Sequence, residues 1–164
     1  MKTNLQAVDM PEFELFLRIK HPVIDPAIIT DTLGLKPEDQ RAAGSTVSKQ
    51  GLQTLHSESY WIAPLPTFST EASLGNLRSL YATSTALALT KQDIIAMAGT
   101  SRFEMLLVTG LKLLSAHKEF LQQLNKEGGS ITLLIQRHDY GALTSLHWQT
   151  LKRLGELGIG IELN

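Results

Sequence analysis

The chain has 164 residues, with 15 Lys and Arg against 16 Asp and Glu, five His and no Cys. A formal net charge of −1 and a hydrophobic fraction of 43% are typical of one globular domain with enough apolar residues for a core. Balanced charge argues against nucleic-acid binding, because phosphates are neutralised by clustered Lys and Arg. The lack of Cys excludes disulfides, thiolate zinc ligands and cysteine nucleophiles.

No segment predicts targeting or membrane insertion. Residues 1–9 lack the apolar run that follows the positive start of a signal peptide. No apolar run approaches the roughly 18 residues that a membrane span requires. We therefore expect a single soluble domain, residues 1–164, in the cytoplasm, without a membrane or nucleic-acid partner.

The first predicted element is a strand over residues 12–20, because apolar and charged residues alternate there with a period of two. A short helix follows, with Asp25 as N-cap, Pro26 in the first helical position and Gly34 at the end. The residues expected on its buried side are Ile28, Ile29 and Leu33.

The middle of the chain is less clearly patterned. Residues 36–59 are polar and predict a long loop, which is followed by a short strand at residues 60–62 that Pro64 stops. Apolar spacing then predicts helices over residues 74–89 and 90–99.

The strongest pattern predicts a helix over residues 102–127. Ser101 and Glu104 form a capping box, and Gly128-Gly129 ends the helix. A continuous helix of this length measures about 39 Å, and Gly110 is the residue expected to divide it if it is not continuous. Its apolar stripe contains Phe103, Leu106, Leu107, Leu111, Leu114, Leu121 and Leu124.

The last part of the chain predicts a strand over residues 130–138, a helix over 143–157 ended by Gly158, and a strand over 159–163. His117 and His147 lie near the middle of the apolar stripes of their helices, which favours core or boundary histidines over metal ligands. The inward positions expected of the last helix are Leu143, Leu146, Leu151, Leu154 and Leu157.

Two segments share one pattern. Residues 17–35 and residues 134–159 each contain a strand ending in a basic residue and His, then a helix that ends in Leu-Gly and an aliphatic residue. With returning strands at Trp61 and Ile159, this predicts a βαβ pseudo-repeat. The expected fold class is α+β, a ferredoxin-like antiparallel sheet with helices on one face and inserted helices at about residues 67–111.

The chain also resembles a known family. Asp25-Pro26 at a helix start, Leu33-Gly34-Leu35 with Pro37, Gly44, and Trp61 after a polar loop resemble the bacterial domain of unknown function 4279 family. The likeness covers about two thirds of the chain, and residues 67–111 depart from it as extra helical sequence. The resemblance implies a fold and no activity; immunity or partner-binding proteins are the nearest analogy.

The sharpest candidate site combines the ends of two strands. If the first and third strands are parallel neighbours, Lys20 and His21 lie beside Arg137, His138 and Asp139. This cluster can bind a small anion, or His138 can act as a base oriented by Asp139 with His21 nearby. The alternative is that strand ends are polar because they are solvated.

Other candidates are weaker. Trp61 and Trp148 can line a pocket or partner surface, although core packing is the alternative for Trp61. Arg41, with Gly44 and Lys49, can hold an anion or simply be solvated in its loop. No spacing of His residues predicts a metal site, and no glycine motif predicts a cofactor.

Two functions therefore remain open. The first is a non-catalytic binding domain for a protein partner or small ligand, and Met105 and Val108 on the polar side of the long helix suggest a homodimer. The second is a small acid–base or hydrolytic enzyme acting on an anionic substrate at the strand-end histidines.

Overall fold

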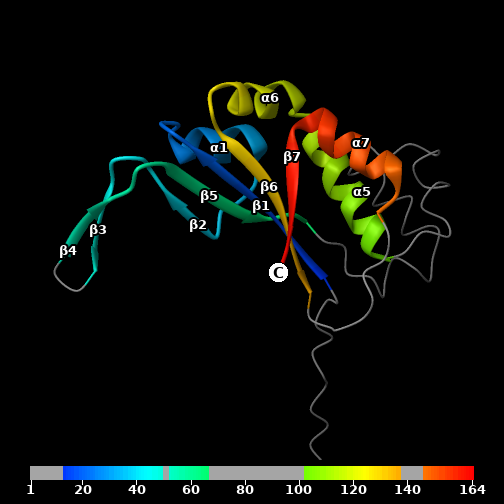
Figure 1. Ribbon diagram of the computed structural model, residues 1–164, viewed down its shortest axis with the longest axis horizontal. Coiled ribbons are helices and arrows are strands. Elements are labelled where there is room, and N and C mark those ends of the chain that lie inside the picture. Colours follow the sequence, from blue (N-terminus) through cyan, green and yellow to red (C-terminus); the bar gives the residue numbers. More distant parts are fainter. Residues whose placement is uncertain (1–12, 50–51, 67–101, 138–145) are drawn as a thin grey trace, which may run out of the picture.

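The computed structural model describes residues 13–49, 52–66, 102–137 and 146–164 (Figure 1). A five-stranded sheet with the order β2-β5-β1-β6-β7 carries the fold, and β3 and β4 form a separate two-stranded sheet. The strands are β1 (Phe13–His21), β2 (Asp39–Arg41), β3 (Thr46–Lys49), β4 (Leu52–Leu55), β5 (Ser59–Pro64), β6 (Ser130–Arg137) and β7 (Ile159–Leu163). The helices are α1 (Pro26–Leu33), α5 (Arg102–Ser115), α6 (Lys118–Lys126) and α7 (Trp148–Leu157). The predicted α+β class is confirmed.

The core lies between one face of the sheet and the helices. Leu15, Leu17 and Ile19 of β1 are buried, and the alternate residues Glu14, Arg18 and Lys20 are partly exposed on the other face. This is the period-two pattern of a strand with its core face buried, although Phe16 on the other face is also buried. Side chains from α1, α5, α6 and α7 all join the cluster that covers this face. Its helical members are Ile29, Leu33, Phe103, Leu106, Leu107, Leu111, Leu114, Leu121, Leu124, Leu154 and Leu157.

The sheet is mixed, so the predicted antiparallel sheet is wrong in one pair. β1 runs antiparallel to both β5 and β6, and β2 antiparallel to β5, whereas β6 and β7 are parallel. The second half of the predicted repeat therefore does form a βαβ unit, β6-α7-β7. The first half does not, because β5 returns antiparallel to β1.

The first half differs in where the chain returns to the sheet. α1 has 8 residues and measures about 12 Å, less than half of the roughly 30 Å of the nine-residue β1. It does not carry the chain back to the start of β1, and β5 instead begins where β1 ends, with Ser59 opposite His21. The pseudo-repeat and the ferredoxin-like arrangement are therefore not confirmed.

The ends of α1 are confirmed at the level of individual atoms. The Asp25 side chain accepts a hydrogen bond of 2.9 Å from the backbone N–H of Ala27. Pro26 occupies the first helical position, and Gly34 adopts the left-handed conformation with φ of 65°. The prediction for Ile28 is wrong, since its side chain is half exposed.

Residues 36–59 are not one loop. β2 adds an edge strand to the sheet, and β3 and β4 form a hairpin that projects away from the helices (Figure 1). The described side chains of β2 and the hairpin are mostly exposed, so buried and exposed residues do not alternate there. The sequence of these segments therefore shows no strand pattern. The predicted helices at residues 74–89 and 90–99 lie outside the described residues.

The predicted long helix is divided, but not at Gly110. α5 ends at Ser115, and α6 begins after His117, whose backbone N–H donates to the Leu114 carbonyl. Gly110 instead lets α5 approach the sheet, because a Cβ there would lie 3.0 Å from the Leu65 side chain. His117 is the N-cap of α6 and is partly exposed, so its predicted place in the middle of a helix is wrong.

α7 is held at its N-terminal end by a side chain of α5. Glu104 is buried, and its Oε1 accepts hydrogen bonds from the His147 backbone N–H (3.1 Å) and the Thr150 hydroxyl (3.3 Å). Glu104 thus caps α7, which sequence spacing had not predicted, while Ser101 lies outside the described residues. His147 is exposed at the N-cap of α7, so the prediction of a core or boundary histidine is wrong for this residue.

Two side chains of α6 hold the other end of α7. Gln122 Nε2 donates to the Glu156 carbonyl at 2.9 Å, and Asn125 Nδ2 donates to the Gly158 carbonyl at 3.0 Å. These carbonyls are among the acceptors that a helix leaves unsatisfied at its C-terminus. α7 is therefore fixed at both ends by its neighbours. None of the described helices is long and apolar enough to cross a membrane.

Candidate functional site

The predicted cluster of strand-end residues is not assembled. β1 and β6 are antiparallel, so Lys20 pairs with Ser130, while Arg137 pairs with Phe13 at the opposite end of β1. From Ser130 to Arg137 is seven positions, or about 23 Å of strand. Placing Arg137 beside Lys20 and His21 was therefore wrong. His138 and Asp139 lie outside the described residues.

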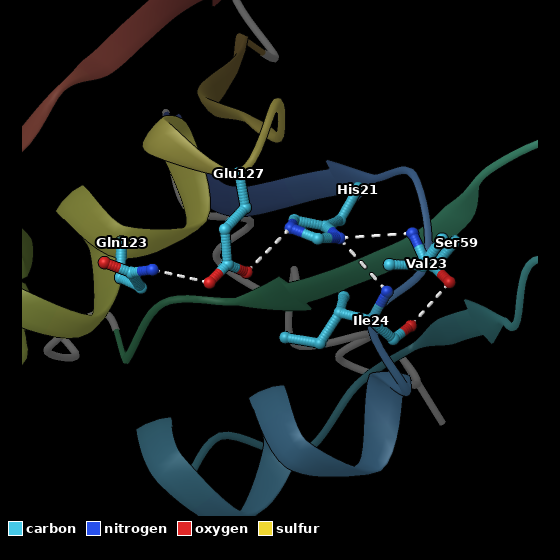
Figure 2. A network of polar contacts seen from close by, with 6 residues as sticks. All are labelled: His21, Val23, Ile24, Ser59, Gln123 and Glu127. Carbon is cyan, nitrogen blue, oxygen red and sulfur yellow. Dashed lines mark hydrogen bonds and ion pairs between the residues drawn. The ribbon is translucent and has the colours of Figure 1, made fainter.

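His21 is the buried polar centre at the end of β1 (Figure 2). Its side chain points to the core side of the sheet and is 2% exposed. Nδ1 accepts hydrogen bonds from the backbone N–H groups of Val23 (3.2 Å) and Ile24 (3.0 Å). The imidazole thereby fixes the turn that leads from β1 into α1.

The other ring nitrogen of His21 faces the C-terminal end of α6. Nε2 lies 3.4 Å from Glu127 Oε2, a close approach that lacks the alignment of a hydrogen bond. The second carboxylate oxygen, Oε1, accepts from Gln123 Nε2 at 2.5 Å. Figure 2 shows this chain of contacts running from α6 through the imidazole to the turn before α1.

These contacts determine which nitrogen of His21 carries the proton. Because Nδ1 accepts from two N–H groups, the neutral ring carries its hydrogen on Nε2, on the side of the ring that faces α6. The ring then has no free lone pair for a substrate. His21 cannot act as a general base unless the turn at Val23 and Ile24 moves away.

The hydroxyl of Ser59, the cross-strand neighbour of His21, is likewise hydrogen-bonded to backbone groups. Its hydroxyl donates to the Ile24 carbonyl at 2.5 Å and accepts from the Ala43 backbone N–H at 2.9 Å. Ser59 is almost completely buried. His21 and Ser59 therefore form no nucleophile–base pair; both hold loops together.

A glycine makes room for the imidazole. A Cβ at Gly129 would lie 2.8 Å from His21 Cδ2 and 2.7 Å from the Leu124 carbonyl oxygen, closer than real Cβ contacts. The Gly128-Gly129 pair therefore does more than end α6. Nothing in the sequence alone connected these glycines to His21, since the contact depends on how β1 pairs with β6.

We expect His21→Ala to lower the free energy of unfolding by about 2–5 kcal/mol, because the N–H groups of Val23 and Ile24 lose their acceptor and a cavity remains where the buried ring was. His21→Asn should lose less, since its amide oxygen can take the place of Nδ1. His117→Ala is the control, because His117 makes no side-chain capping bond. Urea unfolding measures all three, and equal stability of the His21→Ala and His117→Ala variants would contradict this account of His21.

Arg41 and Lys20 lie apart from His21, on the outer side of the sheet, and both are paired. Arg41 is ion-paired with Asp39, and its guanidinium carbon lies 5.0 Å from the centre of the Tyr60 ring. Lys20 Nζ lies 3.2 Å from Glu58 Oε1. Hydrogen bonding from Arg41 holds the pKa of Asp39 below its ordinary value, and the same bond raises the pKa of Arg41.

Replacing Arg41 with Gln should move the titration of the Asp39 carboxyl upward, towards its ordinary pKa. A lowered native pKa means that ionised Asp39 stabilises the fold above the pKa of the unfolded chain, and this stabilisation is lost as pH falls through the native pKa. Because both side chains are about half exposed, the stabilisation is small. Carbon-detected NMR of the carboxyl group measures the shift. Lys20→Gln is the control, because it removes the same charge away from Asp39. If the pKa of Asp39 is the same with and without Arg41, the bond from Arg41 is not the cause of its lowered value.

The two tryptophans occupy opposite environments. Trp61 is 0% exposed, and its Nε1 donates to Thr30 Oγ1 at 3.0 Å. It therefore packs in the core, and no part of it is left to contact a ligand. Trp148 is 63% exposed at the start of α7, with its ring centre 6.5 Å from that of His147.

Trp148 belongs to an exposed stripe of α7 that we call the α7 stripe: Trp148, Leu151 and Gly155. Leu151 is 49% exposed, so its predicted inward direction is wrong. No atom lies within 4 Å of the position that a Cβ of Gly155 would take. A glycine inside a helix costs about 1 kcal/mol relative to Ala, and no contact within the described structure accounts for this one.

The sequence does carry a signal for this stripe. At about 100° per residue, Trp148, Leu151 and Gly155 lie within about 60° of one another, and the buried Thr150, Leu154 and Leu157 follow on one side of them, with Leu154 about 60° from Leu151. The stripe was not predicted, because Leu151 is apolar and was expected to point to the core with the other leucines of the helix.

Within the part of the chain that the structure describes, no group of three His, Asp or Glu side chains can hold a metal ion. Comparison with known proteins found no matching family and no similar curated protein or solved structure. The α7 stripe and the network of His21 are therefore the two features on which a functional proposal can be based.

Proposed function

We propose that this protein is a non-catalytic binding domain that holds a protein partner against the α7 stripe. The observation that carries the proposal is Trp148, a large aromatic side chain that is 63% exposed beside Leu151. Tryptophan is enriched among the residues that dominate protein–protein binding energies, because it buries a large area at little entropic cost.

The anchoring of α7 supports this proposal. Glu104 fixes the N-terminal end of the helix, and Gln122 and Asn125 fix the C-terminal end. A helix held in this way is already ordered before it binds. The entropy lost on association is therefore smaller than for a flexible segment.

The chemistry of His21 also supports binding over catalysis. The enzyme alternative placed His138 as the base, with Lys20 or Arg137 holding an anionic substrate beside His21. Arg137 lies the length of β1 away from Lys20 and His21, and His138 lies outside the described residues. Nδ1 of His21 accepts hydrogen bonds from backbone N–H groups, and the hydroxyl of Ser59 donates to a backbone carbonyl. No observation on the described residues favours an anionic substrate.

The resemblance to the domain of unknown function 4279 family belongs to the same proposal, as do an immunity-type role and a cytoplasmic location. They rest on the sequence features at Asp25-Pro26, Leu33-Gly34-Leu35 and Trp61 and on the composition. They contribute no substrate or reaction.

The proposal is tested by affinity capture with the full chain from a lysate of its own source, followed by quantitative mass spectrometry. Trp148→Ala and Leu151→Ser should each reduce the main captured protein, whether another protein or the chain itself, by about tenfold or more. Leu55→Ser is the matched control, because Leu55 is 66% exposed on the distant hairpin. These surface changes should leave unfolding nearly unchanged. Capture that is equal in all four proteins would refute the proposal.

A further inference from the structure

We propose that the turn from β1 into α1, residues 22–25, is a pH-sensitive device that is closed while the His21 ring is neutral and released when the ring takes up a proton. The proposal is independent of the α7 stripe. It starts from the two hydrogen bonds that Nδ1 accepts from the backbone N–H groups of Val23 and Ile24, which hold this turn closed (Figure 2).

A proton and the closed turn compete for the same atom. A neutral imidazole has one nitrogen that accepts and one that donates, whereas both nitrogens of the cation donate. A proton on Nδ1 of His21 would therefore point at the N–H groups of Val23 and Ile24, and both hydrogen bonds would be lost. Turning the ring over restores neither bond, because the cation has no acceptor on either edge.

The charged groups around the ring do not remove this conflict. Glu127, at the end of α6, lies 3.4 Å from Nε2 and attracts a cation, but from the edge of the ring that faces away from the turn (Figure 2). On the side of β5, Glu58 is ion-paired with Lys20, and on the side of α1 the carboxylate of Asp25 caps the helix. The ring is 2% exposed, so water does not replace the lost bonds while the turn stays closed.

Other contacts hold α1 in place when the turn opens. Ile29 and Leu33 are buried in the core, and Trp61 Nε1 donates to Thr30 Oγ1 at 3.0 Å. None of these three contacts involves the imidazole. We therefore expect a local opening at residues 22–25 while α1 stays on the sheet.

The opening extends to one neighbouring loop. The Ser59 hydroxyl donates to the Ile24 carbonyl at 2.5 Å and accepts from the Ala43 N–H at 2.9 Å. A displacement of Ile24 removes the acceptor of this hydroxyl. Release of the turn therefore also loosens the loop that follows β2.

Amide hydrogen exchange of the purified full chain, followed by NMR, tests the proposal. The quantity is the protection factor of the Ile24 amide, which corrects for the pH dependence of exchange itself. The open turn binds one proton more than the closed turn, and a solvated histidine titrates near about pH 6.5. Protection should therefore fall about tenfold from about pH 7.5 to about pH 5.5. The Leu17 amide, in the central strand, should stay more protected than Ile24 throughout.

Three variants identify the group that takes up the proton. His21→Asn keeps an acceptor for the turn but has no ring to titrate, so its protection at Ile24 should change by less than about twofold over the same range. Glu127→Gln should keep the tenfold fall, and it leaves the turn itself intact, so it tests the proposal even if His21→Asn does not fold. His117→Ala, which removes another histidine next to α6, is the matched control and should also keep the fall.

The outcomes are separate from those of the binding proposal, because none of them involves Trp148. Protection of Ile24 that stays the same across this pH range in the unchanged chain overturns the device. A fall that persists in His21→Asn, or disappears in Glu127→Gln, also overturns it, since the proton then binds elsewhere. An Ile24 amide as protected as that of Leu17 would mean that the turn opens only with the whole fold, which the proposal excludes.

Discussion

β1 is hydrogen-bonded to β5 on one side and to β6 on the other, and both neighbours run opposite to it. The end of β1 therefore meets the beginnings of both strands, together with the loops that lead into them. His21 stands at this meeting point, with Ser59 across from it and Gly129 against its ring. Reversing β5 would take Ser59 to the far end of the sheet, and reversing β6 would take Gly129 there, while the bonds from Val23 and Ile24 to the imidazole are local and would remain.

The same pairing decides where function can lie. It separates Lys20 and His21 from Arg137, and it places His21 and Ser59 where their hydrogen bonds go to backbone groups. Hydrogen bonds from buried side chains to the backbone help to specify one structure, and the atoms that make them are not free to react. The exposed features of α7 then become the stronger basis for function, because that helix is fixed at both ends and presents Trp148 to solvent.

Local sequence signals predicted the parts of the fold that local physics controls. Alternation predicted β1, a short run ending at Pro64 predicted part of β5, and Asp25, Pro26 and Gly34 predicted the ends of α1. The direction of β6 relative to β1 depends on the path between distant segments, and no local residue encodes it. That missing direction is why Lys20 and Arg137 were wrongly placed together. The exposed hairpin and the stripe on α7 were missed because apolar periodicity predicts which side chains are buried. It does not predict how exposed residues are arranged.

The most direct test of the account is the position of the proton on His21, measured by long-range ¹⁵N–¹H NMR at neutral pH. The account predicts a hydrogen on Nε2 and an unprotonated Nδ1 that accepts from the amides of Val23 and Ile24. A hydrogen on Nδ1, or a ring whose two nitrogens exchange rapidly as in a solvated histidine, would contradict it. In that case the imidazole would be free to act as a base, and the enzyme alternative would return.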